Sequence, residues 1–201
     1  AMLGDNPSET IPTFACNWCS YAGADTAGVG RMAYPPNANI IRTMCSGRVS
    51  PDFVWYAFRK GAPVVLVSGC HYVDCHYIDA NRSTTRRLDG LWDGMDKLGL
   101  DPGRLQLEWC SAAEGPRWQH IMEQAEEKRL AVTAGEISET SQLLKEKKVP
   151  SPRNPRPKDE NQPSDFECLI CGEKWEGTYR SNLERSCPTC RSNSVRWIRR
   201  R

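Results

Sequence analysis

The fold is decided by a stretch that runs from residue 64 to residue 77 and reads VVLVSGCHYVDCHY. Its apolar start, with three valines, is typical of a strand that is buried on both faces of a parallel sheet. A glycine and a C-x4-C motif, from Cys70 to Cys75, follow at once. The stretch therefore predicts a strand whose carboxyl end carries two thiols in a loop.

Segments on both sides of this stretch alternate between strand-like and helix-like patterns. The expected strands are residues 13–16, 39–44, 64–68 and 105–109, and the expected helices are residues 51–60, 79–98 and 116–130. Ser50 and Pro51 mark the start of the first of these helices, and Gly61 marks its end. This order predicts an α/β fold: an open parallel sheet flanked by helices, of the Rossmann or flavodoxin-like type, with right-handed connections.

Four cysteines fall at the carboxyl ends of the expected strands. They are Cys16, Cys45, Cys70 and Cys110. In an open parallel sheet these ends share one edge, which is where ligands bind. Cysteines that are distant in sequence are therefore expected to converge in space.

The composition fits one domain of ordinary size with a small appendage. The chain has 201 residues, of which 39% are hydrophobic and 26% are charged. No segment approaches the ~18 apolar residues of a membrane span, and residues 1–10 lack the basic start and apolar run of a signal peptide. We expect a cytoplasmic protein without membrane contact, and we expect most of its ten cysteines to bind metal rather than to form disulfides.

Composition also divides the chain. Residues 1–135 are expected to form the α/β domain, and residues 166–201 a small C-terminal domain. Between them, residues 136–165 lose the apolar periodicity and include VPSPRNPRPKDENQPSD, with five prolines. Such a segment cannot bury enough surface to fold, so it predicts a flexible linker.

The small domain contains the pattern C-x2-C, fifteen residues, C-x2-C, made by Cys168, Cys171, Cys187 and Cys190. This spacing suits a short hairpin between two metal-binding turns, and four thiolates close a tetrahedral zinc site. Iron is the alternative ion, because C-x2-C-G and C-P-x-C also occur in rubredoxins, although the span here is shorter. Two disulfides are a further alternative, which a reducing compartment disfavours. A domain this small lacks a sufficient core, so metal is expected to be required for its folding.

Five further cysteines lie in three predicted loops: Cys16, Cys19, Cys45, Cys70 and Cys75. Iron–sulfur clusters need soft thiolate ligands, usually four, and three cysteine loops on one sheet edge favour a cluster. The C-x2-C motif leaves a thioredoxin-like dithiol open as well. His71 and His76 flank the C-x4-C motif, and either one in place of a cysteine would give a Rieske-type centre.

Five segments together form a recognisable pattern: FACNWCSYAGAD (14–25), YPPN (34–37), IIRTMCSGRV (40–49), LVSGCHYVDCHY (66–77) and LEWCSAAEG (107–115). Over residues 12–131 this pattern resembles the delta subunit of methyl-viologen-reducing hydrogenase, also called the hydrogenase iron–sulfur subunit family. The resemblance says nothing about the linker or the C-terminal cysteines.

The resemblance implies an electron relay in an anaerobic oxidoreductase complex. Members of that family carry a [2Fe–2S] cluster. They pass electrons between a hydrogenase, or a formate dehydrogenase, and the flavin-containing subunit of heterodisulfide reductase-type, electron-bifurcating complexes. The cysteines that match the family motif are Cys16, Cys19, Cys45, Cys70 and Cys75, one more than a cluster needs. Cys110 lies where the resemblance suggests an apolar residue, so we leave it out of the ligand set.

Two other functions are kept as alternatives. The first is a thiol/disulfide oxidoreductase or sulfur carrier that uses Cys16 with Cys19, or Cys70 with Cys75. The second is a zinc-ribbon protein that binds nucleic acid or protein. The net charge of only +2 weighs against nucleic acid. The basic excess is confined to residues 166–201, which hold eight Lys/Arg and four Asp/Glu.

Overall fold

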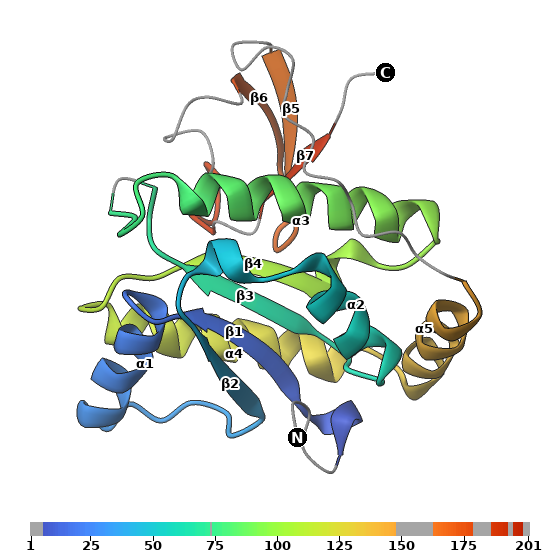
Figure 1. Ribbon diagram of the computed structural model, residues 1–201, viewed down its shortest axis with the longest axis horizontal. Helices are drawn as coiled ribbons and strands as arrows, with labels where there is room; N and C mark the ends of the chain where they lie inside the picture. The colour runs from blue at the N-terminus through green and yellow to red at the C-terminus, as the bar shows by residue number, and fades with distance from the viewer. Residues whose placement is uncertain (1–5, 73, 148–162, 179–185, 193–194, 199–201) are drawn as a thin grey trace.

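The computed structural model describes residues 6–72, 74–147, 163–178, 186–192 and 195–198. Its larger part is a layered α/β unit, and its smaller part is a ribbon of short strands near the C-terminus (Figure 1). The α/β class with a parallel sheet is confirmed. The two parts hold the two sets of cysteines that the sequence predicts as metal ligands.

The larger unit is built on a sheet of four parallel strands. They are β1 (Ile11–Cys16), β2 (Ala38–Thr43), β3 (Val65–Gly69) and β4 (Leu105–Trp109). Their order across the sheet is β2-β1-β3-β4, so β2 and β4 form the edges. All residues of β1 and β3 are buried, which explains their apolar runs.

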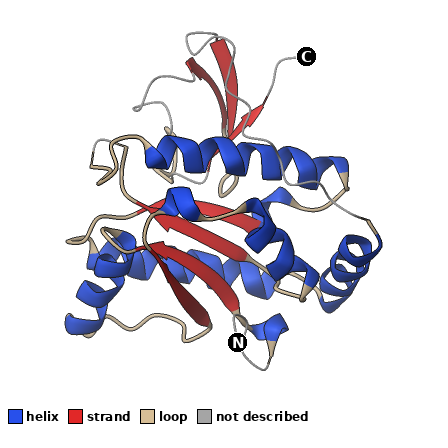
Figure 2. Ribbon diagram, viewed as in Figure 1, coloured by secondary structure: helices blue, strands red, loops and turns tan. Residues whose placement is uncertain are grey.

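Helices cover both faces of this sheet (Figures 1 and 2). They are α1 (Ser20–Val29), α2 (Pro51–Arg59), α3 (Ala80–Lys97) and α4 (Gly115–Ala131). Helices α1 and α4 share a core with Leu66, whereas α2 and α3 share a core with Val65 and Val67. Successive residues of β3 thus serve two separate cores. Within the described residues, no helix is both long and apolar enough to span a bilayer.

The local signals in the sequence agree with the helix and strand ends. Ser50 caps α2 by accepting a hydrogen bond from the Asp52 N–H at 3.2 Å, and Pro51 occupies the first helical position. Gly61, just beyond this helix, has a φ of 92°, which glycine adopts without strain. The predicted elements of the α/β unit all lie within two residues of their observed bounds.

The predicted linker needs a correction. The sequence predicts a linker from residue 136, but the structure has a further helix there, α5 (Ala134–Glu146). A capping box at Thr133 fixes its start, and Leu144 is buried in the core beside α2. The prediction was wrong here because a narrow buried stripe in a charged segment gives little periodic signal. The rest of the predicted linker, residues 148–162, lies outside the described residues.

Arg104 ties α5 to the sheet. Its side chain is buried, and its guanidinium donates hydrogen bonds to the carbonyl oxygens of Pro63, at 2.7 Å, and Ala62, at 3.2 Å. It also donates to Thr140 Oγ1 of α5 at 2.6 Å. A buried cation is tolerated here because its N–H groups are paired. The contacts explain why the charged segment after α4 folds back onto the α/β unit.

The ribbon contains three antiparallel strands in the order β6-β5-β7. They are β5 (Pro163–Cys168), β6 (Lys174–Thr178) and β7 (Val195–Ile198). Phe166 is buried and stacks on Trp175 with ring centroids 5.8 Å apart. Among the residues that the structure describes, the buried core beside them consists of Cys168, Cys187 and Val195. So small an apolar core is consistent with a fold that needs bound metal.

Two glycines of α1 offer a matched test of its packing. A Cβ at Gly23 would lie 2.8 Å from the Ser111 carbonyl oxygen and 2.9 Å from Cys110 Sγ, whereas a Cβ at Gly28 meets nothing within 4 Å. We expect Gly23→Ala to lower the free energy of unfolding by about 2 kcal/mol. Gly28→Ala should raise it by up to about 1 kcal/mol, because alanine is the better helix former. Urea denaturation followed by circular dichroism measures both, and equal effects would contradict the close packing at Gly23.

Candidate metal centres

Three thiols meet at the carboxyl edge of the sheet. Cys16 ends β1, Cys19 precedes α1, and Cys70 follows β3. Their Sγ atoms all lie within 4.8 Å of one another, and those of Cys16 and Cys70 are 3.9 Å apart. All three side chains are buried. The parallel pairing of β1 with β3 brings Cys16 and Cys70 together across 54 residues of sequence.

Cys45 and Cys75 flank this group of three. Cys45 follows β2, is buried, and lies beside Cys16. Cys75 is half-buried and packs against the three thiols. The structure therefore gathers all five candidate cysteines of the α/β unit at one edge. Three of them are close enough to share one metal group, and a cluster with four thiolates would take its fourth from the other two.

Hydrogen bonds within the group favour one thiolate. Cys19 and Cys70 donate to the Cys16 sulfur and hold the pKa of that thiol far below its ordinary value. The same hydrogen bonds raise the pKa of Cys19, and they raise the pKa of Cys70 to about 12. The thiolate is the form of cysteine that binds metal, so metal binding here must release the remaining protons.

Asn81, in the first turn of α3, holds the loop that carries Cys70. Its Nδ2 donates hydrogen bonds to the carbonyl oxygens of Cys70, at 3.2 Å, and His71, at 2.9 Å, and the side chain is fully buried. No motif in the sequence singles out Asn81. A polar residue near a helix start is ordinarily solvated or capping, so only its burial reveals this supporting role.

Both histidines of the C-x4-C loop have partners outside the thiol group. His71 Nε2 lies 2.6 Å from a carboxylate oxygen of Glu114. Burial alone would raise the pKa of Glu114, but the Ser111 N–H and His71 lower it. His76 stacks on Trp18, with ring centroids 3.9 Å apart. Neither imidazole lies in the group of three thiols, so the Rieske-type alternative gains no support from the described residues.

Exposed apolar side chains lie next to the cysteines in all three loops. Trp18 is 43% exposed and Tyr77 is 46% exposed, and the Trp18 Nε1 donates a hydrogen bond of 3.3 Å to the Tyr77 hydroxyl. This contact joins the C-x2-C loop to the C-x4-C loop. Met44, directly before Cys45, is 59% exposed. Apolar surface around a buried group of thiols is typical of a site that meets another protein.

Cys110 lies apart from the other thiols of the α/β unit. It follows β4, but its side chain is buried in the core with α1 and α4. Its Sγ donates to the carbonyl oxygens of Ser111, at 3.4 Å, and Glu114, at 3.6 Å. Burial raises the pKa of its thiol to about 12, which keeps it protonated. Strand register alone would place Cys110 with the others, but its side chain packs in the core that α1 and α4 share.

The four cysteines of the ribbon form the second group. The Sγ atoms of Cys168, Cys171, Cys187 and Cys190 all lie within 4.8 Å of one another. The Cys187 sulfur accepts a hydrogen bond from the Cys190 N–H at 3.5 Å. The N–H of Glu173 lowers the pKa of Cys171, whereas burial raises the pKa of Cys168. Four converging sulfurs with backbone donors beside them fit a single tetrahedral ion.

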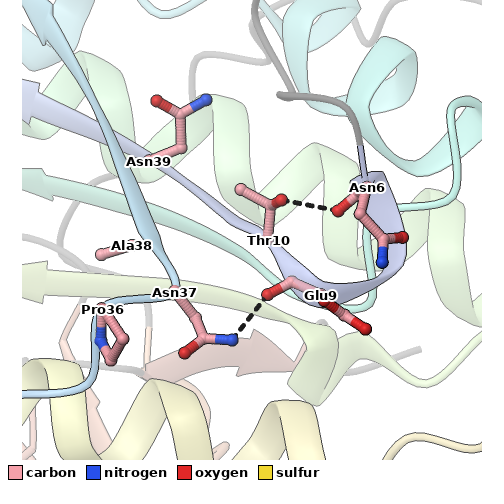
Figure 3. Close-up of a pocket in the computed structure, with 7 residues that line it drawn as sticks. All are labelled: Asn6, Glu9, Thr10, Pro36, Asn37, Ala38 and Asn39. Atoms are coloured by element: carbon pink, nitrogen blue, oxygen red, sulfur yellow. Dashed lines mark hydrogen bonds between the residues drawn. The ribbon is translucent and has the colours of Figure 1, made fainter.

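A cavity of about 490 Å³ lies at the amino-terminal ends of β1 and β2, at the end of the sheet that is opposite to the thiols (Figure 3). Its polar groups bond to one another. Thr10 Oγ1 donates to the Asn6 carbonyl oxygen at 2.7 Å, and Asn37 Nδ2 donates to the Glu9 carbonyl oxygen at 2.9 Å. Ligands of open α/β sheets bind at the carboxyl ends of the strands. The edge that carries the thiols is therefore the candidate site.

Comparison with known proteins places the α/β unit in a family. The family model described as methyl-viologen-reducing hydrogenase, delta subunit, matches residues 11–131. The chain belongs to this family. The matched segment contains the whole parallel sheet and all three cysteine loops. It ends before α5 and the ribbon, so the four cysteines of the ribbon are outside the family segment.

Curated relatives match this chain in two kinds of protein. The iron–sulfur subunit of a hydrogenase from Methanococcus voltae is 48% identical over 120 residues, which are 60% of this chain and 83% of that protein. The corresponding hydrogenase protein from Archaeoglobus profundus is 44% identical over 120 residues, 60% of this chain and 88% of that protein. A much longer chain of a CoB–CoM heterodisulfide reductase from Methanosarcina acetivorans is 49% identical over 112 residues, 56% of this chain but only 14% of that protein.

A cysteine series should separate ligands from bystanders. We expect Cys16→Ser, Cys19→Ser and Cys70→Ser each to lower the iron retained after anaerobic reconstitution by about tenfold or more, because each removes one of the three closest thiolates. Of Cys45→Ser and Cys75→Ser, one should behave in the same way and the other should keep its iron. Iron is measured per folded chain by mass spectrometry.

Cys110→Ala is the control for this series. Its thiol is buried in the core that α1 and α4 share and does not belong to the group of close thiols, so the variant should retain the wild-type iron content. Loss of iron in the control, or full retention in Cys16→Ser, would contradict the ligand assignment.

Proposed function

We propose that this protein is the [2Fe–2S] electron-transfer component of an electron-bifurcating complex of the heterodisulfide reductase type, linked to a hydrogenase or a formate dehydrogenase. The observation that carries the proposal is the convergence of five cysteines from three loops at one sheet edge, in a chain of the hydrogenase delta-subunit family. The curated relatives named as hydrogenase iron–sulfur subunits support the same role.

The chain supplies a protected set of ligands at this edge. Cys16, Cys19 and Cys70 would provide three thiolates, and Cys45 or Cys75 would provide the fourth. Bound there, a [2Fe–2S] cluster supplies one-electron chemistry. The Gly47 N–H already donates a hydrogen bond of 3.4 Å to the Cys45 sulfur. Such donors stabilise negative charge on sulfur and favour the reduced state.

The exposed side chains beside the thiols indicate where electrons leave the protein. Trp18, Tyr77 and Met44 give an apolar rim around a buried group of thiols. A protein surface placed against this rim would lie next to the cluster and exclude water from the path between two redox centres. We therefore assign the partner contact to this rim rather than to the amino-terminal end of the sheet, where the polar cavity lies.

We infer that the partner is a flavin- and iron–sulfur-containing chain of the heterodisulfide reductase type. In the Methanosarcina acetivorans relative, the matching segment is part of the heterodisulfide reductase chain itself. In other relatives, the matching segment makes up most of a small, separate protein. We expect such a separate protein to contact the kind of chain to which the segment is joined elsewhere. Pull-down of a co-expressed heterodisulfide reductase chain, weakened by Trp18→Ala, tests the contact.

Anaerobic reconstitution tests the cluster type. We expect about two irons and two acid-labile sulfides per α/β unit, and an EPR signal of a [2Fe–2S] centre after reduction. Wild-type protein is compared with Cys16→Ser, which should lack the signal. A protein without labile sulfide, whose thiols titrate reversibly as a dithiol, would instead support a thiol oxidoreductase, for which the lowered pKa of Cys16 is the favouring observation.

We also propose that the ribbon binds one zinc ion through Cys168, Cys171, Cys187 and Cys190. Native mass spectrometry of the full chain should show one zinc beyond the iron–sulfur content. Cys190→Ser should abolish this zinc and unfold the ribbon, because its apolar core is too small to hold it, while the α/β unit stays folded. Iron in place of zinc in protein from cells supplied with both metals would contradict the choice of ion.

A further inference from the structure

The edge strand β4 is buried like a central strand. It is the last strand in the order β2-β1-β3-β4, yet all of its residues are buried, whereas the opposite edge strand β2 is only half-buried. A strand edge that is not paired must be exposed or covered by another element. The contacts of Glu108 identify the element that covers it.

The C-terminal ribbon supplies this cover. Ser192 Oγ donates a hydrogen bond of 2.7 Å to Glu108 Oε1 of β4, and the two residues are only 6% and 3% exposed. Leu169, between Cys168 and Cys171, packs against the core that α2 and α3 share. Strand β7 packs against α3, as Figure 1 shows. The ribbon therefore rests on the α/β unit through this buried hydrogen bond, the Leu169 side chain and the contact of β7 with α3.

The position of Ser192 depends on the metal-binding turn of the ribbon. Its carbonyl oxygen accepts a hydrogen bond of 2.8 Å from the Cys187 N–H. Its own N–H donates to the sulfur of Cys190. An ion bound by all four sulfurs ties the two metal-binding turns of the ribbon together, and these bonds are lost when the ion is removed. Loss of the ion would therefore displace the turn, and Ser192 with it.

Glu108 is linked in turn to the thiol loop that follows β3. Arg117 of α4 lies 3.4 Å from the Glu108 carboxylate and donates a hydrogen bond of 2.5 Å to the Trp109 carbonyl oxygen. The Trp109 ring meets the Tyr72 ring edge-on, with centroids 5.4 Å apart. A Cβ at Gly69 would lie 2.7 Å from the same indole. A continuous series of contacts thus connects Ser192 of the ribbon to Gly69 and Tyr72, which lie on either side of Cys70.

We propose that the metal-loaded ribbon is a clamp that positions the thiol loop of the α/β unit. An ion held by the four ribbon cysteines keeps Ser192 on Glu108, and Arg117 and Trp109 transmit this constraint to the loop between Cys70 and Cys75. Ser192, Glu108 and Arg117 are positioning residues in this scheme. The consequence for electron transfer rests on the proposed function, whereas the clamp itself does not.

The physical basis is the cost of a broken hydrogen bond to a buried carboxylate. Such a bond changes an equilibrium constant by about tenfold or more when it is lost. Without the ribbon in place, water reaches the edge of β4, and Trp109 loses one of the constraints that hold it against Gly69 and Tyr72. Local opening of β4 and of the thiol loop should then become more frequent.

Hydrogen–deuterium exchange of the full chain, read by mass spectrometry, tests the clamp. We compare the wild type with Ser192→Ala, which removes the hydroxyl, and with Cys171→Ser, which removes an exposed ribbon ligand. Both should raise the exchange rates of β4 and of residues 69–72 by about tenfold. Ser192→Thr keeps a hydroxyl and should restore protection. Ser138→Ala changes an exposed serine of α5 and serves as the matched control, with wild-type exchange.

The cluster in reconstituted protein gives a second readout, which a contact with a purely structural role would leave unchanged. Ser192→Ala should shift the EPR signal or midpoint potential of the cluster and raise its rate of loss to an iron chelator about tenfold, whereas Ser192→Thr should match the wild type. Unchanged exchange in β4 for both Ser192→Ala and zinc-free Cys171→Ser would overturn the clamp. Changed exchange in a chain that binds no labile sulfide would support the clamp and overturn the proposed function instead.

Discussion

Parallel pairing of β1 with β2 and β3 is the constraint on which the candidate site depends. It places the carboxyl ends of three strands at one edge, and each end continues into a loop that begins with a cysteine or carries one. No local interaction could bring Cys16 within 3.9 Å of Cys70 across 54 residues. The apolar runs that bury β1 and β3 therefore also assemble the thiols, so stability and ligand geometry come from the same interaction.

The surroundings of each thiol then separate thiols with different roles. Cys16 and Cys70 emerge at the edge and share hydrogen bonds that favour a thiolate. Cys110 emerges from the neighbouring strand, but its side chain enters the core beneath α1 and α4, and burial keeps its thiol protonated. The same residue type thus serves as a metal ligand candidate or as a small apolar core residue, according to the side chains that surround it.

The ribbon adds a second metal group outside the family segment, which ends at residue 131. Because the ribbon lies beside β4, it affects the exposure of that strand and the hydrogen bonds of its side chains. An exposed strand edge invites pairing with other chains, and a buried carboxylate such as Glu108 needs donors. The ribbon meets both needs through Ser192 and Leu169. The apolar rim of Trp18, Tyr77 and Met44 beside the other thiols stays exposed.

The sequence by itself determined the four strands of the sheet and the helices α2, α3 and α4, the set of five candidate thiols and the four ribbon cysteines, because periodicity, capping residues and C-x2-C spacing are local signals. The family resemblance supplied the exclusion of Cys110 and the expectation of an electron relay. Only the tertiary structure decided which thiols are closest, that both histidines are engaged elsewhere, that α5 folds back onto Arg104, and that Ser192 reaches Glu108. These depend on contacts between residues far apart in the chain. Such contacts are set by side-chain direction and burial, which leave no periodic trace in the sequence.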